Sequence, residues 1–209
     1  MGATSNCKAA KKGGNKVRVV ARIRPLSARE TSDGSAENLR KLEGKSGDTA
    51  LVQVDGCNGT SVEKKKWYEL DAVLDGSASQ SDVYAQSGAR KAIQEDLFAG
   101  WNASILAYGQ TGAGKTFTMG TASADMTADD NIDGILPRAC RDLFDTLEAK
   151  CVKGKTVVTL SYLELYNEKI RDLLASKGPS TNKDSSLRIR ETPNGGVQVQ
   201  GSVEQLMSI

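Results

Sequence analysis

Apolar and polar residues along the chain, from residue 17 onward, follow the spacing of short strands and helices. Over Val17–Ile23, β-branched residues interspersed with arginine predict a strand, and Pro25 ends it. The next stretch, 31–66, is rich in Gly, Ser and Asp. Its apolar segment at 50–54 is compatible with a small hairpin.

A helix and a second strand are predicted in the middle of the chain. Ser79 and Asp82 resemble a capping box, and the apolar residues that follow keep helical spacing as far as Gly100. The short apolar run 104–108 leads into glycines and predicts a strand that ends in a loop.

The last third of the chain repeats this alternation. Pro137 is a favoured early helix residue, and one helical face is predicted to be apolar. That face consists of Leu136, Ala139, Cys140, Leu143, Phe144 and Leu147. The pattern predicts a strongly apolar, buried strand at Val157–Leu163 and a helical turn at 170–174. It also predicts a hairpin at 187–200 with its turn at 193–196. Without an internal repeat, the pattern predicts one α/β domain.

Charge is unevenly distributed along the 209 residues. The net charge is only +2, but the first 29 residues carry eight Lys or Arg and no acid, so the remaining 180 residues are acidic overall. Residues 1–16 have no apolar run and are expected to form a disordered basic arm. Such an arm either contacts an acidic partner or simply keeps the chain soluble.

Composition excludes several classes of protein. The chain has no histidine, which removes His-based catalytic pairs and triads and makes a zinc site improbable. No apolar run is long enough for a membrane span, and the start lacks the apolar core of a secretory signal. We therefore expect a cytoplasmic protein with neither a membrane nor a nucleic acid as partner. Its cysteines should be reduced and mostly buried: Cys7, Cys57, Cys140 and Cys151.

One segment matches the phosphate-binding pattern G-x-x-x-x-G-K-[ST] at every fixed position. Its residues are Gly109, Gln110, Thr111, Gly112, Ala113, Gly114, Lys115 and Thr116. Glycines let successive backbone N–H groups turn toward an anion, Lys115 supplies a positive charge to the β- and γ-phosphates, and the Thr116 hydroxyl is placed to bind Mg²⁺. The sequence thus predicts binding of a nucleoside triphosphate. The helix after this loop should be short, because Gly120 and a polar run follow it.

Hydrolysis is not predicted from these residues. Enzymes with this loop normally carry a second apolar strand that ends in a magnesium-binding Asp, and a residue that orients the attacking water. The best apolar strand, Val157–Leu165, has Glu164 and Tyr166 at its end instead. The sequence leaves the catalytic residues unknown.

Four motifs together resemble the kinesin motor domain. Arg22–Leu26 is similar to an R-x-R-P element, and Asn102–Gly120 is close to N-A-[ST]-I-x-A-Y-G-Q-T-G-x-G-K-T-x-T-M-x-G. Gly134–Arg138 is similar to G-I-[IL]-P-R. Ser161–Glu168, followed by 171–174, resembles S-[YF]-x-E-[IL]-Y-N-E and D-L-L. These motifs occur in the family's order over residues 17–209.

The resemblance implies a P-loop NTPase fold, with a mixed sheet flanked by helices and ATP bound with Mg²⁺. Carried over by position, Arg22, Arg24 and Pro25 would frame the adenine. Phe117 would lie beside the base, where relatives often have Tyr or His. A π-face is kept there, but a hydrogen-bonding group is lost, so discrimination between bases is expected to be weaker.

The resemblance also has a limit. The family's two switch motifs, N-x-x-S-S-R-S and D-x-A-G-S-E, are not found in this sequence. The fold is therefore expected to be incomplete at the C-terminus, with 17–209 as the N-terminal part of a motor domain. Microtubules are the partner that the family implies, but of the tubulin-facing surface only the hairpin with Arg188 and Arg190 is expected here, so binding should be weak.

The sequence is compatible with three hypotheses for function. In the first, the chain is the ATP-binding portion of a microtubule motor, associated with the cytoskeleton and driven by ATP hydrolysis. In the second, it is a non-catalytic nucleotide-binding or interaction fragment that exposes an unpaired sheet edge. A generic P-loop kinase or GTPase is the weakest, because 182–184 lacks the spacing of a guanine-reading motif.

Overall fold

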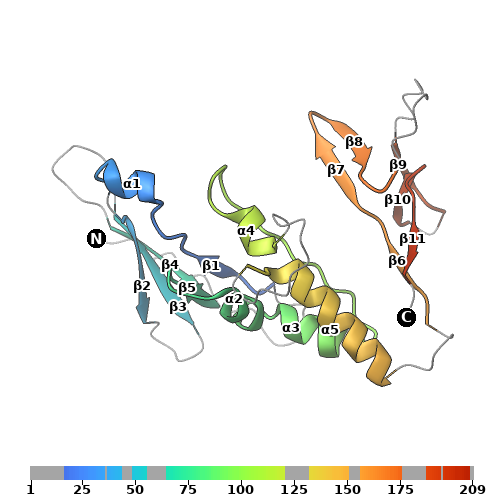
Figure 1. The fold of residues 1–209 in the computed structure, drawn as a ribbon, viewed down its shortest axis with the longest axis horizontal. Coiled ribbons are helices and arrows are strands. Elements are labelled where there is room, and N and C mark those ends of the chain that lie inside the picture. The colour runs from blue at the N-terminus through green and yellow to red at the C-terminus, as the bar shows by residue number, and fades with distance from the viewer. Residues whose placement is uncertain are drawn as a thin grey trace, which may run out of the picture. The chain divides into compact units, whose positions relative to one another are not determined.

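A computed structural model describes most of the chain from residue 17 onward. The described residues are 17–35, 37–43, 49–55, 65–120, 132–150, 156–175, 187–193 and 195–207. The expected arm at 1–16 lies outside them. The chain forms two compact units, Met1–Leu143 and Phe144–Ile209, and each has sheets of its own (Figure 1).

The first unit contains two small sheets. Strand β1 (Val20–Arg22) pairs in parallel with β5 (Ala72–Leu74), with Val20 opposite Ala72. The strand expected at 17–23 is therefore confirmed, although it is shorter. Antiparallel strands β2 (Leu39–Glu43), β3 (Ala50–Val54) and β4 (Lys66–Leu70) form the other sheet, so 50–54 is the middle strand of three.

The helical segment predicted from Ser79 to Gly100 is present but interrupted. The capping box between Ser79 and Asp82 is confirmed, and α2 (Gln80–Gln86) follows it. Gly88, with φ of 87°, separates α2 from α3 (Ala89–Lys91), which continues into a π-helical turn, η1 (Ala92–Asp96).

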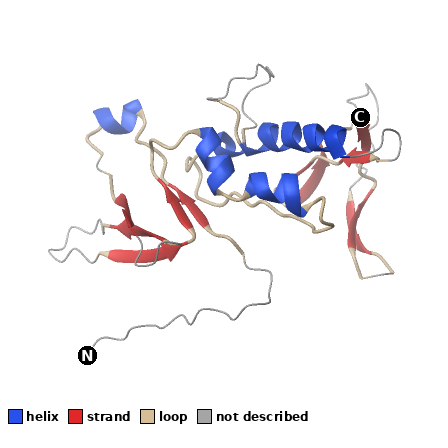
Figure 2. Cartoon of the chain, turned by 90° about the horizontal axis from the view of Figure 1, so that it is seen from below, coloured by secondary structure: helices blue, strands red, loops and turns tan. Residues whose placement is uncertain are grey.

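Helix α5 (Ile135–Lys150) is the longest of the blue helices in Figure 2. It confirms the helix predicted around Pro137, and the predicted apolar face is partly buried: Ala139 and Leu147 are buried, whereas Leu136 and Cys140 are exposed. Ile135 and Arg138, which the prediction did not include, are also buried. Burial of Arg138 is possible because its Nε donates to the Asp133 carbonyl at 2.8 Å. Cys140 thus contradicts the expectation of buried cysteines, and the other three cysteines lie outside the described residues.

The core of the first unit lies where α2, α3 and the first turns of α5 meet strand β5. Its buried residues are Leu74, Val83, Tyr84, Ala89, Ile135 and Ala139. Tyr84 is 1% exposed, and its hydroxyl donates to Asp142 Oδ2 at 2.8 Å. Burial raises the pKa of Tyr84, and the hydrogen bond to Asp142 adds to this effect. A buried hydroxyl therefore crosslinks α2 to α5.

The strand predicted at 104–108 is not formed. Residues 101–109 have no regular structure, and the side chains of Leu106 and Tyr108 are 91% and 101% exposed. A strand is stabilised by cross-strand pairing and by burial of one face, not by composition alone. None of the strands in the described residues pairs with this segment.

The second unit contains three antiparallel pairs of strands. Its strands are β6 (Val158–Leu160), β7 (Leu163–Tyr166), β8 (Lys169–Asp172), β9 (Arg188–Glu191), β10 (Val197–Gln200) and β11 (Gln205–Met207). β6 pairs with β11, β7 with β8, and β9 with β10. The last pair confirms the hairpin predicted at 187–200.

Two predictions for this unit are wrong. The expected buried strand is divided into β6 and β7, and its Val157 and Leu165 are each 72% exposed. The expected helical turn at 170–174 begins instead as β8. Asn167 and Glu168 have φ of 47° and 61°, as in a two-residue hairpin turn, and this turn directs the chain back along β7.

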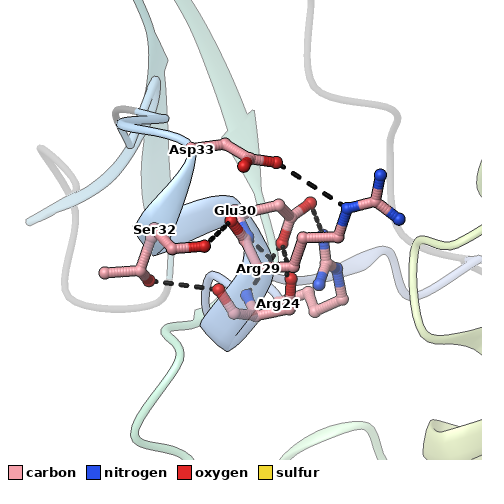
Figure 3. A network of polar contacts seen from close by, with 7 residues as sticks. Arg24, Arg29, Glu30, Ser32 and Asp33 are labelled. Atoms are coloured by element: carbon pink, nitrogen blue, oxygen red, sulfur yellow. Dashed lines mark hydrogen bonds and ion pairs between the residues drawn. The ribbon is translucent and has the colours of Figure 1, made fainter.

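Helix α1 (Ala28–Ser32) lies just after β1 and begins with a second capping box, which the sequence analysis did not identify. Ser27 accepts from the Glu30 N–H at 3.3 Å, and the Ser27 N–H donates to Glu30 Oε2 at 2.7 Å. The other carboxylate oxygen of Glu30 accepts from Arg24 at 2.5 Å, as Figure 3 shows. The hydrogen bond from Arg24 is the main cause that lowers the pKa of Glu30 to about 2, and the bonds from Ser27 add to it.

No helix within the described residues is long and apolar enough to cross a membrane. Nor do those residues contain a group of three His, Cys, Asp or Glu side chains that could hold a metal ion.

The Tyr84 hydroxyl predicts a stability effect. Tyr84→Phe removes its hydrogen bond to a carboxylate and should lower the free energy of unfolding by about 1–2 kcal/mol. Urea unfolding followed by circular dichroism measures this difference. Tyr68→Phe, at a half-exposed position of β4, is the matched control and should change stability by less than about 0.5 kcal/mol. Equal effects of the two substitutions would contradict the role of the hydroxyl.

The Glu30 carboxylate predicts a pH dependence. Its pKa is about 2 in the folded chain against an ordinary value of 4.5, so ionised Glu30 favours the folded state above pH 4.5. This contribution declines as pH falls from about 4.5 toward 2, because the unfolded chain then takes up the proton first. Urea midpoints at pH 7, 4 and 3 should therefore show wild type losing its advantage over Glu30→Gln toward acid. A difference that stays constant with pH would exclude this contribution; Glu148→Gln, at an exposed site of α5, is the control.

Candidate functional site

The predicted phosphate-binding loop folds around its own lysine. Gly112 and Gly114 have φ of 82° and 90°, and the Ala113 N–H donates to the Gln110 carbonyl at 3.1 Å. The Lys115 ammonium donates to the carbonyls of Gly109 and Gln110 at 2.7 and 2.9 Å. Because an ammonium has three donors, one remains for a ligand.

Helix α4 (Lys115–Met119) follows the loop and has five residues, which confirms that it is short. Its first backbone hydrogen bond to the loop runs from the Thr118 N–H to the Gly114 carbonyl at 2.9 Å. The N–H groups of residues 115–117 precede this bond and so have no helical partner.

Two glycines close the loop between α4 and α5 at its base. Gly120 ends α4 with φ of 78°, and its backbone lies directly against that of Gly134. A Cβ at either position would overlap the backbone of the other, so only glycine fits at both. The loop itself, 121–131, lies outside the described residues.

Arg22 lies against α4. Its NH1 donates to Thr118 Oγ1 at 3.0 Å and to Gln80 Oε1 at 2.9 Å. The guanidinium carbon is 5.0 Å from the centroid of the Phe117 ring, within range of a cation–π interaction. Partial burial lowers the pKa of Arg22. Two of the four residues expected at the base, Arg22 and Phe117, are thus in contact with each other, and the Phe117 ring is 49% exposed.

Arg24 and Pro25 continue from β1 past the same loop. The aliphatic stem of Arg24 lies beside Gly114, whose Cβ, if present, would be 3.7 Å from Arg24 Cδ. The guanidinium of Arg24 is held by Glu30. Pro25 packs on Gly76, at the end of β5. The R-x-R-P segment and the loop are therefore neighbours, although 80 residues or more separate them in sequence.

Thr116 is exposed beside Lys115 at the start of α4, and Thr111 is exposed on the loop. The residues present fit a magnesium–triphosphate group: the Lys115 ammonium keeps one donor for a ligand, the Thr116 hydroxyl is exposed, the first N–H groups of α4 have no helical partner, and a Cβ at Gly112 would meet open space.

The sequence analysis did not single out Gln80 or Glu30. The sequence does contain a pattern that identifies Glu30, since Ser27-x-x-Glu30 is a capping box before a helix. No pattern identifies Gln80, because a polar residue in the first turn of a helix is usually exposed. Its burial depends on partners far away in sequence.

Comparison with known proteins places these features in one family. The description "Kinesin motor domain" matches residues 22–208. The chain is 36% identical over 193 residues to Kinesin-related protein 8 of Dictyostelium discoideum, covering 92% of this chain and 9% of that protein. It is also 36% identical over 196 residues to Kinesin heavy chain of Syncephalastrum racemosum, covering 91% and 18%.

Solved structures agree. A fast kinesin superimposes with a TM-score of 0.69 at 31% identity over 92% of this chain and 49% of the other. KIF14[391-755] with ADP, in complex with a microtubule, gives a TM-score of 0.67 at 30% identity over 92% and 51%. The chain thus spans about half of each solved chain, and the expected α/β, kinesin-like fold class is confirmed. Because the match extends over nearly the whole described sequence, the chain belongs to the kinesin motor domain family.

Proposed function

We propose that this chain binds ATP with Mg²⁺ and is the nucleotide-binding part of a microtubule motor. The observation that carries the proposal is the loop 109–116, in which Lys115 keeps one donor for a ligand and the first N–H groups of α4 have no helical partner. Membership of the kinesin family supports the choice of nucleotide.

In this proposal the phosphates lie in the loop. Gly109, Gln110, Thr111, Gly112, Ala113, Gly114, Lys115 and Thr116 would surround them, with Lys115 as the positive charge. The loop supplies mainly N–H groups and one ammonium, both of which stabilise anionic oxygens. The Thr116 hydroxyl would be a Mg²⁺ ligand, and the metal, when bound, would neutralise phosphate charge.

The base would lie beside Arg22, Arg24, Pro25 and Phe117. The ring of Phe117 is half-exposed and is fixed on one side by Arg22, so a planar base has an aromatic surface to pack on. Phe117 has no polar group to read a base edge. We therefore infer a preference for purine bases in general over strict selection of adenine.

For the whole protein we propose a motor that couples ATP hydrolysis to movement along microtubules in the cytoplasm. The solved relative in complex with a microtubule supports this partner. Within this chain, Arg188 and Arg190 on the exposed strand β9 are basic residues that acidic tubulin would attract. Neither switch motif occurs in the sequence, so we assign no catalytic residue here and propose 17–209 as the N-terminal part of the motor domain.

Lys115→Ala is the direct test. Loss of a charge-assisted contact of roughly 2–3 kcal/mol should weaken ATP binding about 30- to 150-fold, because the ammonium is the one side-chain cation of the loop. Isothermal titration calorimetry with Mg²⁺–ATP measures the affinity. Lys91→Ala removes the same charge from an exposed position of α3 and should leave affinity within about twofold.

The ATPase rate of the same protein, with and without microtubules, separates the two main readings. Microtubule-stimulated turnover that Lys115→Ala abolishes would exclude the non-catalytic fragment. A flat background rate in the presence of tight ATP binding would limit this chain to nucleotide binding. Absence of ATP binding by the wild-type chain would overturn the proposal itself.

Thr116→Ala tests the metal. Wild type should bind ATP at least about tenfold more tightly with Mg²⁺ than with EDTA, since the ion bridges phosphate and protein oxygens. Thr116→Ala should lose most of this difference while keeping its affinity for metal-free ATP. Thr111→Ala, an exposed threonine of the same loop, is the matched control and should keep the magnesium effect. An unchanged magnesium effect in Thr116→Ala would exclude Thr116 as a ligand.

A further inference from the structure

Gln80 is the most deeply buried polar side chain of the described residues. It is the first residue of α2 and is only 2% exposed, in contact range of β1, α4 and the chain before α5. Burial of an amide costs a few kcal/mol unless its polar atoms are hydrogen-bonded. Because burial of a glutamine at this position has an energetic cost, packing alone does not explain its presence.

The amide of Gln80 makes three hydrogen bonds. Its Oε1 accepts from Arg22 NH1 at 2.9 Å. Its Nε2 donates to the carbonyl of Phe117 at 2.7 Å and to that of Ile132 at 3.3 Å. Both donors of the amide are thus used, and two of the three partners are the residues expected beside the base.

We propose that Gln80 is a positioning residue for the base end of the nucleotide site. It acts through Arg22 and Phe117 and does not itself touch the nucleotide. This inference rests on the proposed binding of ATP.

The geometry explains why one amide has this effect. Arg22 NH1 donates to both Gln80 and Thr118, and these two bonds hold the guanidinium over the Phe117 ring. The same amide also donates to the backbone carbonyl of Phe117. Without Gln80, Arg22 keeps one of its two hydrogen bonds and the Phe117 carbonyl loses its donor.

The phosphate end does not depend on Gln80. Lys115 is held by carbonyls of the loop itself, and α4 is joined to the loop by the Thr118 N–H and Gly114 carbonyl. A change at Gln80 should therefore weaken recognition of the base and leave recognition of the phosphates. A role confined to stability would lower both affinities together.

The experiment compares a ligand that has a base with one that has none. The affinities of the 209-residue chain for Mg²⁺–ATP and Mg²⁺–tripolyphosphate are measured by isothermal titration calorimetry. Gln80→Met keeps the length of the side chain but loses its hydrogen bonds. It should weaken ATP binding about tenfold, which is the effect of losing about 1.4 kcal/mol, and change tripolyphosphate binding less than about twofold. Gln86→Met, at an exposed site of the same helix, should change neither.

A double substitution tests whether Gln80 acts through Arg22. If it does, Gln80→Met should change the ratio of ATP affinity to tripolyphosphate affinity less in the Arg22→Met variant than in the wild-type chain. Should Gln80→Met fail to fold, Gln80→Glu is used instead. It keeps the acceptor for Arg22 but cannot donate to Phe117, and it should also lower ATP affinity selectively.

The outcomes distinguish the two proposals. Wild type that binds neither ligand would overturn nucleotide binding and, with it, this inference. Wild type that prefers ATP, with the same preference in the Gln80 variants, would overturn the positioning role alone. Equal weakening of both ligands in a folded variant would also overturn it.

Discussion

The hydrogen bonds between Arg22 and its two acceptors on α2 and α4 are the contacts on which the site geometry depends. They join three segments that are far apart in the sequence: β1, the start of α2, and α4, the helix after the loop 109–116. Each segment is too short to be stable alone, since β1 has three residues and α4 has five. Burial of Gln80 makes the junction specific, because a buried amide tolerates few arrangements of its partners. The positions of the residues at the proposed base end are therefore fixed by tertiary hydrogen bonds and not by local helix or strand preference.

A second constraint is that strands need partners. Segment 104–108 has the composition of a strand, but in the described residues it has no partner and stays irregular. The second unit shows the same effect in a milder form, because its strands pair only in twos and leave large side chains such as Leu165 and Leu206 exposed. Two-stranded sheets are at best marginally stable without a packed face. The well-packed part of the chain is accordingly the region where α2, α3 and α5 cover β5.

Sequence alone could predict those features that depend on local chemistry. The loop 109–116, the capping box at Ser79, the short helix before Gly120 and the hairpin at 187–200 all follow from residue type and spacing. The predictions are wrong where contacts between residues far apart in the sequence determine the local structure. Residues 170–174 have the apolar spacing of a helical turn, but the turn at Asn167 and Glu168 pairs 170–172 with β7. Burial of Arg138 in place of Leu136 depends on a carbonyl before α5, and burial of Gln80 depends on partners on three segments. None of these contacts leaves a periodic signal in the sequence.

The charges around the site are arranged unequally. Three cations lie in or near the loop and α4: Lys115 belongs to the loop, Arg24 lies beside Gly114, and Arg22 contacts α4. Within the described residues, Arg24 is paired with a carboxylate, Glu30, whereas Arg22 and Lys115 donate to neutral oxygens. Two positive charges are therefore left uncompensated by protein anions, one at the proposed base end and one in the loop. Two such positive charges favour binding of an anion. The net negative charge of a triphosphate with its magnesium ion is close in size to the positive charge of the two cations. Arg24, paired with Glu30, contributes its aliphatic stem beside Gly114 more than an unpaired charge.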